Sequence, residues 1–103
     1  MNIQEIPLTP INQQFSISLG GQLVNMRINW RDDAGWILTL IGSTGETLAN
    51  GIPLVPEVDL LEQYAHLGIN GSLWVVNDIA AGEYPTKTDL GITSHLYFVQ
   101  GEP

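Results

Sequence analysis

Cysteine is absent from this chain of 103 residues, and basic residues are scarce, with three Lys and Arg against 11 Asp and Glu. Without cysteine there is no disulfide framework, no thiolate chemistry and no Cys-based metal site. The formal net charge of −8 argues against direct nucleic-acid binding, because such binding needs Lys and Arg to displace phosphate counterions. These shortages exclude several classes of protein before any motif is considered.

Long apolar runs are also missing. The longest uncharged apolar run is far shorter than the ~20 residues of a membrane-spanning helix. The first residues, Met1–Glu5, lack the basic region and apolar core of a signal peptide. We therefore expect synthesis in the cytoplasm and no membrane contact.

Charged residues make up only 14% of the chain, below the ~25% of typical soluble domains, while hydrophobic residues make up 44%. Two explanations remain open. Partners cover part of the surface, or a compact β domain uses Ser, Thr, Asn and Gln as its polar surface. The length predicts a single domain over residues 1–103, with flexible ends at 1–4 and 100–103.

Alternation with a period of two dominates the chain and predicts strands. Residues 14–19 alternate strictly, residues 24–31 continue the pattern, and residues 36–41 are apolar on both faces, as in a central strand. Further strands are expected from Thr47 towards Pro53 and at 73–76 and 95–99. The predicted fold is all-β, a small barrel or sandwich of six to seven mostly antiparallel strands. The residues expected in its core are Phe15, Ile17, Met26, Ile28, Trp30, Leu38, Leu40, Trp74 and Val76.

One short α-helix is expected at about residues 59–67. Asp59 precedes two leucines, and Glu62 follows three residues later, which matches a capping box. In that arrangement Asp59 accepts from the N–H of Glu62, and Glu62 accepts from the N–H of Asp59. Gly68 stands where a left-handed C-terminal cap would lie.

Candidate catalytic and metal-binding groups are few. His66 and His95 are far apart in the sequence, with no carboxylate at ligand spacing. The Asp32–Asp33 pair has too few oxygen ligands nearby for calcium, and is better explained as a hairpin turn. No serine lies in a nucleophile elbow, and no glycine-rich loop suits phosphate. We expect no catalytic residue, no cofactor and no metal, and therefore no enzyme.

Two segments place apolar groups where a sheet cannot pair fully, because proline lacks an N–H. The first contains Pro53, Leu54 and Pro56, and the second contains Tyr84 and Pro85. Each segment either covers an end of the β domain or meets another subunit. We predict both as protein contacts.

The three tryptophans, Trp30, Trp36 and Trp74, allow two explanations. They could line a platform for a sugar or a base. Each one also continues an apolar alternation, so core packing is the default.

The chain resembles the small baseplate plug proteins of contractile-tailed bacteriophages and their prophage relatives. Residues 51–64 carry the clearest similarity, and the order and spacing of other pieces extend it over roughly residues 5–98. These pieces are Ile6–Pro10, Gln14–Phe15, Asn29–Trp30, Trp36, Leu67–Gly68, Gly71–Val75, Tyr84–Thr86, Asp89–Gly91 and His95–Leu96.

The resemblance implies a non-enzymatic structural protein of the virion, a central plug at the junction of the tail tube and the baseplate hub. It implies contacts with those tail proteins and with copies of the chain itself. The alternative is a free-standing β-barrel or β-sandwich module that binds a carbohydrate or small ligand. The acidic balance fits the first function, since a tail lumen that passes DNA gains from repelling phosphate.

Overall fold

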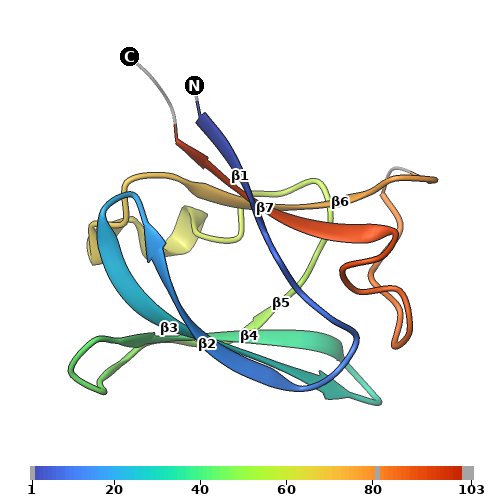
Figure 1. Ribbon diagram of the computed structural model, residues 1–103, viewed down its shortest axis with the longest axis horizontal. Helices are drawn as coiled ribbons and strands as arrows, with labels where there is room; N and C mark the ends of the chain where they lie inside the picture. Colours follow the sequence, from blue (N-terminus) through green and yellow to red (C-terminus); the bar gives the residue numbers. More distant parts are fainter. Residues whose placement is uncertain (1, 81, 101–103) are drawn as a thin grey trace.

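Seven strands in two separate antiparallel sheets make up the protein, and the computed structural model describes residues 2–80 and 82–100 (Figure 1). The strands are β1 (Asn2–Ile6), β2 (Gln13–Leu19), β3 (Gln22–Arg31), β4 (Gly35–Gly42), β5 (Thr47–Pro53), β6 (Ser72–Asn77) and β7 (Ser94–Gln100). The all-β class and the number of strands are confirmed. The sheets do not close into a barrel, so the fold is the sandwich form of the prediction.

The larger sheet has the order β2-β3-β4-β5 and follows from the alternation in the sequence. In β3 the even-numbered residues Val24, Met26 and Ile28 are fully buried on one face, and the odd-numbered residues between them are exposed or half-buried. The neighbouring strand β4 buries Trp36, Leu38 and Leu40. Strand β4 lies between β3 and β5, which confirms that the segment apolar on both faces is internal.

The smaller sheet has the order β1-β7-β6 and contains a strand that the sequence did not predict. Residues 2–6 pair with β7 over their whole length, from Asn2 opposite Gln100 to Ile6 opposite Leu96. Residues 2–4 of the predicted flexible end 1–4 are therefore part of a paired strand, and the flexibility of that end stays a prediction. The other predicted flexible end is 100–103, and Gln100 is the last residue of β7. Met1 and residues 101–103 lie outside the described residues.

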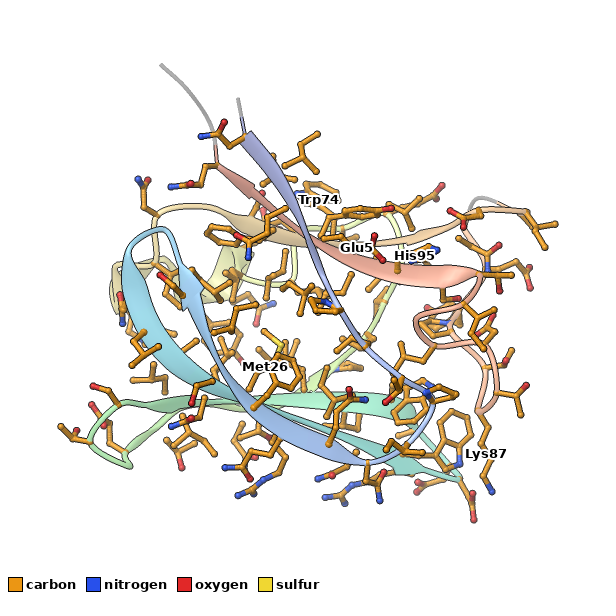
Figure 2. The ribbon with its side chains drawn as sticks, viewed as in Figure 1. Glu5, Met26, Trp74, Lys87 and His95 are labelled. Carbon is orange, nitrogen blue, oxygen red and sulfur yellow. The ribbon has the colours of Figure 1, made fainter. Side chains whose placement is uncertain are left out.

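The core lies between the two sheets and joins them (Figure 2, where Met26 lies in this layer). Of the predicted core residues, Met26, Ile28, Leu38 and Leu40 are fully buried, while Phe15, Ile17 and Trp30 are partly buried against the core. Trp74 and Val76 are not core residues, because Leu73 and Val75 occupy the inward positions of β6. Strand β6 is apolar on both faces, so its composition could not reveal which face points inward.

The expected α-helix at 59–67 is wrong. Only Glu62–Leu67 is helical, as a 3-10 helix (η1) that is kinked at Tyr64. The preceding residues are tied to β6, since the Leu60 N–H donates to the Leu73 carbonyl. This attachment holds residues 59–61 as a turn, and too few residues follow to propagate an α-helix.

One end of the sandwich closes through a close backbone approach at Gly91. Its φ is +81°, and a Cβ at this position would lie 2.0 Å from the Leu8 carbonyl oxygen. Only glycine fits that conformation and that space. The segment after β1 is thereby packed against the loop before β7.

Candidate interaction surfaces

The predicted contact segment at the end of β5 is mostly buried. Pro53 is exposed and lies opposite Ile37 of β4, whereas Leu54 and Pro56 are buried. The Leu54 N–H donates to the Trp36 carbonyl at 3.0 Å, so sheet pairing continues one residue beyond Pro53. Of this segment only Pro53 presents its side chain for a contact.

Pro53 forms part of an open hollow between the end of β5 and η1. The hollow has a volume of about 470 Å³, and its apolar lining residues include Ile52, Val55, Val58 and Tyr64. Asp59, Glu62 and Gln63 add polar groups to the same lining. Its mixed lining and open shape suit a protein contact better than an enclosed small molecule.

Asp59 and Glu62 do not form the predicted capping box. The Asp59 Oδ1 accepts hydrogen bonds from the N–H groups of Leu61 at 2.9 Å and Leu73 at 3.2 Å. The N–H of Glu62 instead donates to the Asp59 backbone carbonyl at 3.2 Å. Asp59 therefore connects the turn before η1 to strand β6, which is a tertiary role that sequence spacing could not indicate.

The second predicted contact, Tyr84 and Pro85, also has one exposed and one buried residue. Tyr84 is 62% exposed, while Pro85 is buried. The Trp36 Nε1–H donates to the Thr86 carbonyl at 2.8 Å, which holds this loop over the core. Tyr84 alone is available at the surface.

Asp89 organises the remainder of that loop. Its Oδ1 accepts from the Thr86 N–H at 2.7 Å, and its Oδ2 accepts from the hydroxyls of Thr93 and Ser94. Burial acts to raise the pKa of Asp89, but these hydrogen bonds outweigh it and lower the pKa. The loop before β7 is thus fixed by its own side chains.

A surface that the sequence did not predict lies on the outside of the smaller sheet. Ile3 and Val76 are 63% and 44% exposed there, and three half-buried side chains lie between and beside them. We call this surface the outer apolar face; it consists of Ile3, Trp74, Val76, Tyr97 and Val99. Strand pairing explains the cluster, since Ile3 lies opposite Val99 and Trp74 opposite Tyr97.

Trp74 lies at the outer side of the smaller sheet, away from Met26 and the core (Figure 2). Its Nε1–H donates to the Ser72 hydroxyl at 2.7 Å. The indole N–H is therefore already satisfied, and the ring offers an apolar surface.

His95 borders the outer apolar face and is held by two carboxylates. Its Nδ1 lies 2.6 Å from Glu5 Oε2, and its Nε2 lies 2.7 Å from Asp78 Oδ2 (Figure 2 labels Glu5 and His95). Both ring nitrogens donate only in the imidazolium form, so two ionised carboxylates favour the charged histidine. The two acids approach opposite nitrogens, an arrangement unlike the convergence of ligands on one metal ion.

The electrostatics of this cluster follow from the geometry. Burial acts to lower the pKa of His95, but the hydrogen bonds and charges of Asp78 and Glu5 outweigh it and raise the pKa. Burial raises the pKa of Tyr97, and the charges of Glu5 and Asp78 add to the effect. The boundary of the outer apolar face is accordingly acidic.

The outer side of the larger sheet differs in composition. It presents polar side chains, such as Ser16, which donates to the Asn25 amide oxygen at 2.6 Å, together with the exposed Leu23. Arg27 lies on this side and donates through Nε to Gln14 at 3.2 Å, and Arg31 is exposed on the same strand. Two of the three basic residues of the chain therefore lie on β3, and the third, Lys87, lies in the loop before β7.

Among residues 2–80 and 82–100, no helix combines the length and apolar character needed to cross a membrane. The described residues also contain no grouping of three His, Cys, Asp or Glu side chains suited to hold a metal ion. The surfaces described above are the candidate contact sites, and the side chains of the outer apolar face are almost all apolar.

Comparison with curated proteins found no match. Comparison with protein-family models found one for the cyanophage baseplate Pam3 plug gp18, which covers residues 3–101 and so nearly the whole sandwich. The chain thus belongs to the cyanophage baseplate Pam3 plug gp18 family.

Proposed function

We propose that this chain is a non-enzymatic structural protein of a bacteriophage or prophage tail baseplate, where it acts as the central plug at the junction of tail tube and hub. The family match over residues 3–101 carries the proposal. That family supports a role in the baseplate and a location in the virion tail. The position on the tail axis and the absence of catalysis are the finer parts of the proposal.

The surfaces of the domain are consistent with a structural role. The exposed side chains of Pro53, Tyr84 and the outer apolar face project from three different regions of the sandwich. Contacts in several directions are what a component enclosed by other subunits requires. We propose the tail tube, the hub and further copies of the chain as its neighbours.

The net charge of −8 supports a place in the tail channel. DNA carries a high density of negative charge, and an acidic lining repels it rather than holding it. A plug with this charge closes the channel without binding the genome.

The alternative function, a free-standing carbohydrate-binding module, finds little support at Trp74. The ring is in an open position, but its N–H is occupied by Ser72, and of the other four residues of the face only Tyr97 carries a polar side-chain group. A sugar site needs hydrogen-bonding groups beside the ring to orient the hydroxyls.

Deletion of the gene tests the proposal. A phage or inducible prophage without the chain should produce particles with incomplete baseplates, or tails that leak or fail to assemble, and wild-type protein from a plasmid should restore infectivity. The plasmid control separates loss of the protein from effects on neighbouring genes. Fully infectious particles that lack the protein would refute the proposed function.

A further inference from the structure

We infer that the outer apolar face is a docking site for a different protein, whose apolar contact surface is bordered by Lys or Arg. The inference deepens the proposed function, because it assigns one contact of the baseplate component to a defined surface and a defined partner chemistry. Three properties of the face lead to it: its apolar centre, its acidic border and its mismatch with other surfaces of the chain.

The centre of the face is apolar and lies outside the core. Ile3 and Val76 are 63% and 44% exposed, on the two edge strands that flank β7. Trp74 and Tyr97 lie opposite one another between them, and Tyr and Trp are enriched at the centres of protein interfaces. An exposed apolar cluster on a sparsely charged chain is typical of an interaction site.

The border of the face has unused acceptors. His95 engages Glu5 through Oε2 and Asp78 through Oδ2. Among the residues that the structure describes, Glu5 Oε1 and Asp78 Oδ1 receive no protein hydrogen bond, and the side chains are 47% and 54% exposed. Each acid can therefore accept from a Lys or Arg of a partner while it still holds His95.

In the described part of the chain, Lys and Arg side chains do not pair with the carboxylates of this border. Arg27 and Arg31 lie on β3 in the other sheet, and Figure 2 places Lys87 far from Glu5 and His95. Within residues 2–80 and 82–100 the ion pairs of Glu5 and Asp78 are with His95. Complementary charge must come from another molecule.

A second copy of the chain is a poor occupant. Two outer apolar faces placed against each other would bring acidic borders together on molecules of net charge −8. The outer side of the larger sheet carries Arg27 and Arg31, but it would place the polar rows of Gln14, Ser16 and Asn25 against an apolar centre. Burial of the Arg27 charge in such a contact is unfavourable, because its hydrogen-bond partner Gln14 is neutral.

Nucleic acid and anionic membranes are excluded by the same acidic border, since both carry negative charge. The remaining occupant is a distinct protein with an apolar centre and a basic border. In the assembled tail this partner is one of the neighbouring components.

Photo-crosslinking in purified particles tests the inference. The crosslinking residue p-benzoylphenylalanine would replace Val76 in one variant and Leu23 in a control, because Leu23 is also exposed but lies on β3 of the other sheet. The Val76 variant should join to a different protein, at a segment where Lys or Arg flanks apolar residues, and the Leu23 variant should not join to that segment. An adduct with a second copy of the chain, an adduct with a segment that lacks Lys and Arg, or no adduct from the Val76 variant would overturn the inference.

A charge placed in the face gives a second readout. Val76→Lys should reduce the amount of the chain in purified particles by about tenfold or more, whereas Leu23→Lys should leave it unchanged. Circular dichroism should confirm that both variants fold. Should Val76→Lys fail to fold, Val76→Thr keeps the β-branched shape and should reduce incorporation to a smaller degree. Normal incorporation of a folded Val76→Lys protein would contradict the inference.

An immunoblot of wild-type particles separates this inference from the proposed function. If the chain is absent from the particles, the proposed function fails. The docking site is then judged by the same two crosslinking variants in infected cells, with the same criteria for the joined segment.

Discussion

His95 illustrates how a single side chain can connect a whole sheet. Its ring lies on β7, Glu5 belongs to β1, and Asp78 follows β6, so one imidazolium bridges the three strands. No local sequence signal indicates this cluster, because it forms only when β1 pairs with β7. The sequence predicts no carboxylate partner for His95, whereas in the structure Glu5 and Asp78 lie against its two ring nitrogens.

The raised pKa of His95 makes its contribution to stability depend on pH. A group whose pKa is raised by folding stabilises the native state fully below its unfolded value, about 6.5 for histidine, and the contribution disappears as the pH rises through the folded value. The loss of unfolding free energy in His95→Gln should therefore be larger at about pH 6 than at about pH 9. Urea unfolding of both proteins at the two pH values measures this, and an equal or larger loss at the higher pH would contradict it.

Asp59 is a second residue whose role is tertiary. Asp59→Ala should reduce the free energy of unfolding by about 1–3 kcal/mol, because it leaves the N–H groups of Leu61 and Leu73 without their acceptor. Glu62→Ala is the matched control and should change stability by no more than about 0.5 kcal/mol, since Glu62 is exposed. Denaturant unfolding of both variants makes the comparison. Equal losses would support the capping box instead.

At the level of elements, the two faces of strand β6 separate a core position for Trp74 from a surface position. Leu73→Ala should cost about 2–5 kcal/mol, because Leu73 is fully buried between the sheets. Trp74→Ala should cost less, about 1–2 kcal/mol, because only part of the ring leaves water on folding. Thermal and urea unfolding rank the two variants, and a greater loss for Trp74→Ala would place the indole in the core.

The elements that the sequence predicted are those with a clear alternation. Strands β2 and β3 have polar residues between their apolar ones, so both the strand and its inward face could be inferred. Strand β6 has no such contrast, and β1 is a short strand at the chain terminus whose only buried residue is Ile6. Residues 59–61 have a helix-like spacing of apolar and acidic residues in the sequence. Their hydrogen bonds to β6 form only in the folded protein, so the local sequence cannot reveal them.

The predicted contact residues show the same limit. Pro53 is the last residue of β5, and Pro56 and Pro85 lie outside the strands, but Leu54, Pro56 and Pro85 are all buried. Lack of an N–H says nothing about whether a side chain faces solvent. The outer apolar face was missed for a related reason, since its five residues come from β1, β6 and β7 and meet only through strand pairing.

At the scale of the whole molecule, the two sheets present different outer surfaces. The larger sheet presents polar side chains and the arginines of β3, and the smaller sheet presents the outer apolar face with its acidic border. Such a two-sided domain is suited to lie between unlike neighbours. This agrees with membership in a baseplate plug family and with the shortage of charged residues in the sequence.

Cryo-electron microscopy of purified tails tests the central claim most directly. The account predicts density for the seven-stranded sandwich on the tail axis, between the end of the tail tube and the hub, with the outer apolar face against a different protein. Particles from the deletion strain should lack that density and serve as the control. Density for the chain found only away from the tail tip, or a complete baseplate with no copy of it, would contradict the account.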